Sequence, residues 1–248
     1  MYKVNFQKLV LPLFLMAVLL FSFEAQANTP LKKNTILIFS LTKGFRHASI
    51  ADGIKAIKKM GVENNFLVDT SEDVNVFTIA NLKKYSALIF LSPTGTNVFN
   101  DSQKQALKEY IHTGGRFVGI HAATDFCYEW DWYGKMVGGY FESHPKIQSV
   151  KLNIVMPKNK IVKGLPQPWI HTDEWYNFKN VNPDLNILIK ADETSYEGGK
   201  MNNNHPISWY HEFEGGKVFY TALGHTKECY TDPLFLMHLW AGMKWAMQ

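Results

Sequence analysis

Gly114-Gly-Arg-Phe-Val-Gly-Ile-His-Ala-Ala-Thr-Asp125 is the stretch of sequence that decides the fold. Its two glycines end a helix that begins at Asn100 or Asp101. Arg116–Ile120 is then an apolar strand, and His121 follows at a strand-to-helix elbow, a turn that projects its first residue into a cleft. The stretch therefore predicts a helix, a buried strand and a candidate site residue in succession.

Strands and helices alternate before this stretch as well. Residues 35–40 and 87–91 are continuous apolar runs, typical of strands buried on both faces of a parallel sheet. Between them we expect a helix over residues 48–60 that ends at Gly61, a short strand over 65–68 and a short helix over 79–82. This order predicts an α/β fold: a flavodoxin-like three-layer α/β/α arrangement with a mostly parallel, doubly wound sheet and ligands at the carboxyl ends of its strands.

The pattern changes beyond about residue 145. Residues 147–155 alternate between apolar and polar, which indicates a half-exposed strand of an antiparallel pair. Further strands are expected over residues 186–190, 206–210 and 217–223, with Gly215-Gly216 as a hairpin turn before the last one. A closing helix is predicted over residues 233–247. No linker or repeat interrupts the chain, so we expect added antiparallel strands in one domain over residues 28–248.

The N-terminus has the pattern of a secretory signal peptide. Lys3 and Lys8 supply positive charge, residues 9–23 are apolar, and Ala25-Gln26-Ala27 is a small-x-small cleavage site. The apolar run is short for a bilayer-spanning helix, although an uncleaved anchor is the alternative. We expect a mature chain that starts near Asn28, is periplasmic or secreted, and has no integral membrane segment.

Composition narrows the classes of function. The formal charge of +4 comes from 26 basic and 22 acidic residues without a basic run, which argues against nucleic-acid binding. Two cysteines exclude a disulfide scaffold and a four-thiolate zinc site. Cys127 and Cys229 each follow a predicted cleft-edge turn in a chain destined for an oxidising compartment, and whether they pair is left open.

Histidines follow three of the predicted strands. Lys43-Gly-Phe-Arg-His47 comes after the first strand, His121 after the fourth, and His225 after the last. Because an imidazole acts as an acid, a base or a metal ligand near neutral pH, we expect His121 and His225 to be catalytic. Together with His47 they are also candidate ligands for a divalent metal such as zinc.

Connecting segments add polar and aromatic candidates. As acid or base partners of the histidines we expect Asp125, Glu142 and Glu174. As substrate-binding residues we expect Arg46, His47, His144, Trp175, His205 and Trp209.

Six motifs follow one another along the chain. They are Lys43–His47, Gly114–Asp125, Gly138-Gly139 with Phe141 and His144-Pro145, Asp173-Glu174-Trp-Tyr, His205-Pro-Ile-Ser-Trp209 and Gly216–Thr226. In this order they resemble the ThuA-like (trehalose utilisation) family over roughly residues 34 to 247. The resemblance implies the fold of class I glutamine amidotransferase domains and a link to sugar metabolism, including 3-keto disaccharides.

The sequence departs from the amidotransferase pattern at the catalytic positions. His121 stands where those enzymes have a nucleophilic Cys, and Glu228 lies one residue too far from His225 for their His-x-Glu motif. Glutamine amidotransferase chemistry is therefore not expected.

Three functions remain open from the sequence. The first is an exported enzyme of carbohydrate metabolism that acts on a small-molecule sugar or an oxidised sugar such as a 3-keto-glycoside, as a hydrolase or lyase. The second is a non-catalytic carbohydrate-binding protein in which Trp130, Trp132, Trp175 and Trp209 stack on sugar faces. The third is a hydrolase of another class on the same scaffold. The oligomeric state is left open.

Overall fold

Five parallel strands form the centre of the fold in the computed structural model, which describes residues 1–3 and 34–248. They lie in the order β2-β1-β3-β4-β11, which is the flavodoxin-like order with β11 as the fifth strand. Their bounds are β1 (Thr35–Phe39), β2 (Leu67–Ser71), β3 (Ala87–Leu91), β4 (Arg116–Ile120) and β11 (Gly216–Thr221). The predicted fold class is confirmed, whereas the predicted signal peptide and mature start lie outside the described residues.

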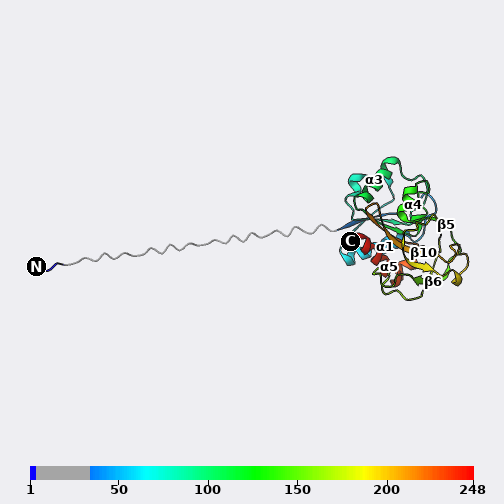
Figure 1. Cartoon of the computed structure of the whole chain (residues 1–248). Coiled ribbons are helices and arrows are strands. Elements are labelled where there is room, and N and C mark those ends of the chain that lie inside the picture. Colours follow the sequence, from blue (N-terminus) through cyan, green and yellow to red (C-terminus); the bar gives the residue numbers. More distant parts are fainter. Residues whose placement is uncertain (4–33) are drawn as a thin grey trace. The chain divides into compact units, whose positions relative to one another are not determined.

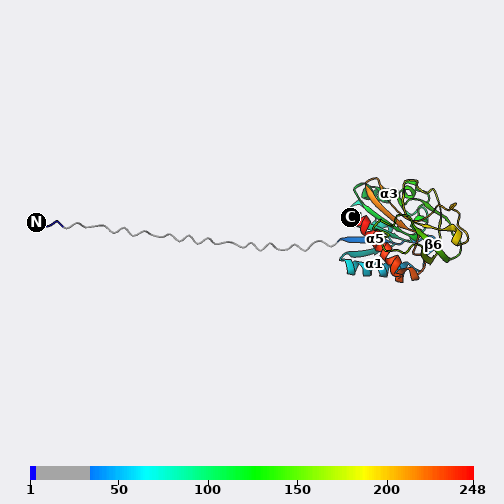
Figure 2. The same cartoon turned by 60° about the horizontal axis from the view of Figure 1, so that its bottom comes forward.

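Helices cover both faces of this sheet, which explains why β3 is apolar at every position. On one face lie α1 (Ile50–Asn64) and α5 (Pro233–Met247), and on the other lie α3 (Asp101–His112) and α4 (Asp131–Val137) (Figures 1 and 2). The short α2 (Ile79–Leu82) packs against α3.

Antiparallel strands extend the sheet beyond β11. β10 (His205–Phe213), β9 (Asn186–Ala191), β6 (Gln148–Ile154) and β7 (Trp169–Asp173) follow in that order, so that one sheet contains nine strands within residues 34–248. Outside this sheet, β5 (Tyr140–Ser143) pairs with β8 (Asn177–Lys179). The sequence did not predict β5, β7, β8 or α4.

Two predicted turns are displaced by a few residues. α1 continues past Gly61 to Asn64, and the left-handed Asn65 (φ 60°) caps it with an N–H bond to the Gly61 carbonyl. Gly61 is needed for packing instead of termination, because a Cβ there would lie 2.9 Å from the Phe66 carbonyl oxygen. The β10–β11 turn consists of Glu214 and Gly215, both with positive φ, one residue earlier than expected.

Both cysteines are free and buried, so no disulfide joins Cys127 to Cys229. Burial raises the pKa of each thiol above its usual range.

Among the described residues, no helix is long and apolar enough to cross a membrane.

Gly242 fixes the distance between α5 and the sheet. A Cβ at this position would lie 2.2 Å from the ring of Phe219 on β11. Gly242→Ala is therefore expected to lower the free energy of unfolding by about 1–3 kcal/mol, the usual cost of overpacking, as measured by urea denaturation. Gly139→Ala is the matched control, since its nearest neighbour would lie at an ordinary 3.4 Å. Equal stability of the two variants would contradict this view of the α5 contact.

Candidate functional site

Three imidazoles meet at the carboxyl ends of β1, β4 and β11. The Nε2 atom of His121 lies 3.1 Å from Nε2 of His47 and 3.1 Å from Nδ1 of His225. The parallel sheet explains this meeting, because loops that follow neighbouring parallel strands lie at one edge. The structure thus brings together the three histidines that the sequence proposed as metal ligands.

His121 occupies a strained elbow. Its φ is +49°, a left-handed conformation that is uncommon for a residue other than glycine. The sequence predicts that the elbow projects this side chain into a cleft, but His121 is 0% exposed. The Nδ1 atom lies 2.8 Å from the Ala222 carbonyl and donates to it, so that in the neutral ring the lone pair is on Nε2 and faces the other two histidines.

Glu174 adds a carboxylate to the three imidazoles. It follows β7, and its Oε2 atom lies 3.1 Å from Nδ1 of His225 and 3.5 Å from Nε2 of His121. Its other oxygen lies 3.0 Å from Nδ1 of the half-exposed His144, which fixes the orientation of the carboxylate. Burial alone would raise the pKa of Glu174, but its contacts with the rings of His121 and His225 outweigh burial and lower it.

Burial and mutual repulsion set the charge of the histidines. Burial, reinforced by the charges of His121 and His225, lowers the pKa of His47 to about 2, so its ring is neutral. Burial would also lower the pKa of His225, but the hydrogen bond to Glu174 and the charge of that carboxylate raise it. Near neutral pH the cluster therefore offers a neutral His47 beside a carboxylate.

These four residues match the donor set of a zinc site. The four ligand atoms, one from each residue, lie within 4.8 Å of one another. Zinc bonds of about 2.0–2.2 Å in a tetrahedron place neighbouring ligand atoms about 3.3–3.5 Å apart. Four of the six pairs here, all but His47–His225 and His47–Glu174, lie 3.1–3.5 Å apart. Nitrogen from imidazole and oxygen from carboxylate are both usual zinc ligands.

A cavity of about 380 Å³ opens onto the cluster. Asp125 lies on its wall, and burial raises the pKa of this carboxylate despite a 2.6 Å hydrogen bond from the Tyr128 hydroxyl. Its lining residues are Phe45, His47, Asp125, Phe141, His144, Glu174, Tyr176 and His225. The cavity thus combines an aromatic wall with polar groups, as small-molecule sites commonly do.

Two charged residues from the sequence prediction do not line this cavity. Arg46 is exposed and pairs with Glu72 at 2.7 Å, because its side chain turns away from the neighbouring His47. Glu142 is exposed on β5, where alternation along the strand points it outward while Phe141 reaches the cavity.

Trp175, Trp209 and His205 are fully buried, so the prediction that they contact substrate is corrected. Both tryptophans donate their indole N–H to backbone carbonyls in the core, Trp175 to Gln148 and Trp209 to Val137. The Nε2 atom of His205 lies 2.8 Å from the Tyr176 carbonyl, so this imidazole supports the cavity wall from behind.

The sequence did not predict the aromatic wall of the cavity. The ring of Tyr176 packs against the ring of His121 at 4.3 Å between centroids, tilted by 35°, and Phe141 packs on Tyr176 at 4.3 Å. Phe45 is 66% exposed and contacts His47 edge-on. Their place in the sequence could have indicated two of these aromatic residues, because Phe45 and Tyr176 belong to the same short motifs as His47 and Glu174.

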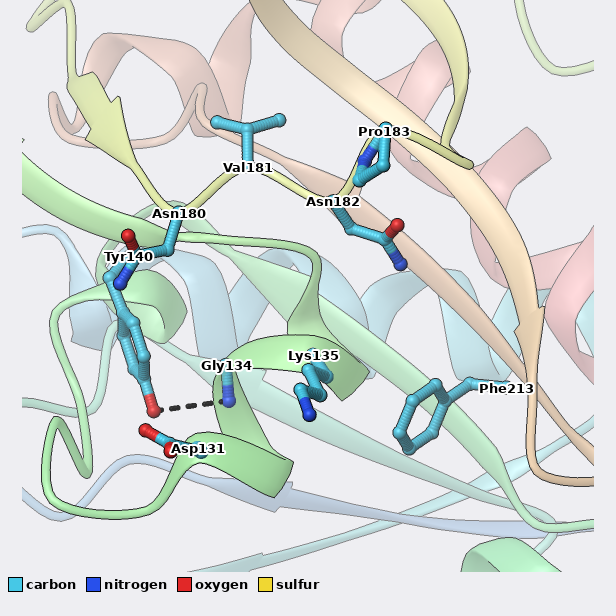
Figure 3. A pocket seen from close by; sticks show the side chains of 9 residues that line it. All are labelled: Asp131, Gly134, Lys135, Tyr140, Asn180, Val181, Asn182, Pro183 and Phe213. Carbon is cyan, nitrogen blue, oxygen red and sulfur yellow. Dashed lines mark hydrogen bonds between the residues drawn. The ribbon is translucent and has the colours of Figure 1, made fainter.

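A second cavity of about 500 Å³ has a different set of lining residues. Figure 3 shows Asp131, Lys135 and Phe213 on its wall, with Tyr140 hydrogen-bonded to the Gly134 N–H at 3.1 Å. No residue that the sequence predicted for the site lines it, and it contains no histidine.

The fold and the site define a class: a doubly wound α/β protein with three histidines and a glutamate gathered at the carboxyl ends of its strands. A family model described as ThuA, trehalose utilisation, matches residues 35–246. The chain belongs to this family. None of the curated proteins compared with the chain matches it.

Solved structures share the fold. A ThuA-like protein from Bacteroides uniformis is 22% identical with a TM-score of 0.73, over 89% of this chain and 94% of that chain. One from Parabacteroides merdae is 20% identical with a TM-score of 0.70, over 88% and 91%. A β-galactosidase from Bacillus circulans is 12% identical with a TM-score of 0.57, over 85% of this chain and 30% of that chain. At these identities the likeness concerns the fold alone.

Proposed function

We propose that this ThuA-family protein is an exported, metal-dependent enzyme that acts on a sugar or on an oxidised sugar such as a 3-keto-glycoside. The family links the chain to trehalose utilisation. The observation that supports a bound metal is the close grouping of possible ligand atoms. Two imidazole nitrogens lie 3.1 Å from His121 Nε2, and a carboxylate oxygen lies 3.5 Å from it.

Hydrogen bonds alone do not satisfy this arrangement. A neutral His121 has its proton on Nδ1, which donates a hydrogen bond to the Ala222 carbonyl. Its Nε2 atom therefore has one lone pair and can accept from only one of the two neighbouring rings. The Nδ1 atom of His225 likewise has one proton at most for two neighbours, His121 and Glu174. A cation at the centre would satisfy all four groups at once.

The residues around the cluster have distinct roles in the proposal. A divalent cation such as zinc would be held by His47, His121, Glu174 and His225. It would act as a Lewis acid on a sugar carbonyl or hydroxyl oxygen that it accepts as an additional ligand. Asp125, with its raised pKa, exchanges a proton with the bound sugar, and Tyr128 holds that carboxylate in place.

The aromatic wall suits the apolar face of a sugar ring. Phe45, Phe141 and Tyr176 present ring surface to the cavity, and His144 supports Glu174 at its rim. This wall replaces the four tryptophans as the stacking surface, since Trp175 and Trp209 are in the core and neither Trp130 nor Trp132 lines the cavity.

The proposal is tested with mature protein purified without chelator. We expect one zinc per chain by elemental analysis and turnover of a 3-keto-glycoside that stops on dialysis against chelator and returns with zinc. Thermal stabilisation by the sugar without turnover would favour a binding protein. Turnover of simple esters or amides alone would favour a different hydrolase. Full turnover by a zinc-free protein would refute the proposal that the activity depends on a metal.

Export is tested separately. Mass spectrometry of the protein from its native host is expected to find an N-terminus at or near Asn28, because the small-x-small site precedes it. A retained Met1 would contradict cleavage and indicate a membrane anchor.

A further inference from the structure

Asp173 is a fully buried carboxylate that lies behind the site and does not line its cavity. Its Oδ2 atom accepts the Gly224 backbone N–H at 2.7 Å, and its Oδ1 atom accepts the Thr226 N–H at 3.2 Å. These two amides flank His225. One carboxylate thus holds the backbone on both sides of a candidate metal ligand.

The next residue in the chain holds the same histidine by its ring. Glu174 lies 3.1 Å from Nδ1 of His225, so two consecutive residues fix both the backbone and the side chain of His225. Asp173 ends β7, and three strands separate β7 from β11 in the sheet order. The contact therefore joins the outer antiparallel strand to the loop that follows the central β11.

Neutral donors and a histidine surround Asp173 on its far side. The Cys229 thiol donates to Oδ2 at 3.2 Å, and burial raises its pKa so that it remains protonated. His171 lies 3.6 Å from that sulfur through Nε2, while its Nδ1 lies 3.3 Å from Asp232. Because Oδ2 of Asp173 already has an amide and a thiol as donors, this second cluster is better explained as a supporting hydrogen-bond network than as a second metal site.

We propose that Asp173 is a positioning residue that sets the distance of the His225 ring from His47, His121 and Glu174. The inference rests on the proposed function in that it takes His225 as a metal ligand. Groups that orient metal ligands typically contribute about 10–100-fold to metal affinity. An asparagine at 173 keeps the size of the side chain but replaces one accepting oxygen by an N–H₂ group. Because this group donates and cannot accept, one of the two backbone amides loses its acceptor.

The test compares Asp173→Asn with the full wild-type chain. Zinc affinity is measured by chelator competition, and backbone hydrogen exchange is measured over residues 222–226. We expect Asp173→Asn to bind zinc about 10–100-fold more weakly and to exchange faster at Gly224 and Thr226 without a matching change in α5. His238→Asn is the control for general destabilisation, because His238 is also buried and hydrogen-bonded but contacts Ser208 and Ile161 outside the site. Its zinc affinity should equal that of the wild type.

The outcomes separate the two proposals. A folded Asp173→Asn variant with wild-type zinc affinity and unchanged exchange would overturn the positioning role. A wild-type protein that does not bind zinc would reject the proposed metal, and the exchange rates at Gly224 and Thr226 would still decide whether Asp173 holds the loop. If Asp173→Asn does not fold, Asp173→Glu takes its place. It keeps the charge but displaces the carboxylate by one methylene, and wild-type affinity in that variant would also overturn the role.

Discussion

His121→Ala is expected to abolish stoichiometric zinc binding and to lower turnover by about 10²–10⁴-fold, the range for loss of a group that transfers a proton or binds the reacting centre. The reason is geometric. His121 is the one residue whose Nε2 lies within 3.5 Å of the other three candidate ligands. Its removal therefore breaks three of the contacts that define the site, more than a change at any single neighbour does.

The backbone at His121 calls for a second variant. Its positive φ disfavours alanine, whereas asparagine tolerates the left-handed region. His121→Asn should therefore fold better and still lose the metal. His211→Ala is the matched control, since His211 is a buried histidine that bonds to the Met136 carbonyl away from the cluster. Wild-type zinc content and rates in a folded His121→Asn, His225→Ala double variant would contradict the site, and the carbohydrate-binding interpretation would then take precedence.

The variant His47→Ala gives a graded comparison. The ring of His121 is oriented by its bond to Ala222, whereas Nδ1 of His47 is buried with no hydrogen-bond partner among residues 34–248. Because an outer partner strengthens a metal ligand, the loss of His47 should weaken zinc binding less than the loss of His121.

The parallel half of the fold was predictable because its information is local. Apolar runs bounded by glycines and caps located β1, β3 and β4, and the rule that ligands bind at strand carboxyl ends then placed His47, His121 and His225 at one edge. These three positions required no knowledge of which strands are neighbours in the other half of the sheet.

Glu174 was a candidate from its motif, but its partners were not predictable. It arrives from β7, a strand that the sequence did not reveal, at the far edge of an antiparallel extension whose order is set by tertiary packing. Trp209 shows the converse error. β10 is buried from His205 through Trp209, so both faces of that strand are covered and a tryptophan there packs in the core. Residue type alone did not distinguish an aromatic residue of the cavity wall from one of the core.

We expect a second large effect on stability: the free energy of unfolding should fall when the protein is acidified. His238 on α5 is fully buried between the Ile161 carbonyl and the Ser208 hydroxyl, and burial lowers its pKa from 6.5 to about 4. Both partners are uncharged, and the hydrogen bond to the Ile161 carbonyl, which favours a proton on the ring, only partly offsets burial. The unfolded chain takes up this proton near pH 6.5 and the folded chain only near pH 4.

Between these two values the unfolded state binds more protons, so the free energy of unfolding falls as the pH falls. The contribution of His238 is fully present above pH 6.5 and is lost toward pH 4. A pKa lowered from 6.5 to about 4 corresponds to about 3 kcal/mol. Urea unfolding at pH 7 and pH 4 should show this loss in the wild type in addition to that from other buried histidines such as His205 and His211, whose pKa values burial also lowers.

His238→Gln isolates the effect, because glutamine keeps a polar side chain on α5 but does not titrate. The variant should be less stable than the wild type at pH 7, since it loses the fitted imidazole, yet its stability should fall by about 3 kcal/mol less between pH 7 and pH 4. Zinc content at pH 7 should be unchanged, because His238 contacts none of the four candidate ligands. Parallel pH profiles for the two proteins would show that His238 is not the buried group that makes the fold sensitive to acid.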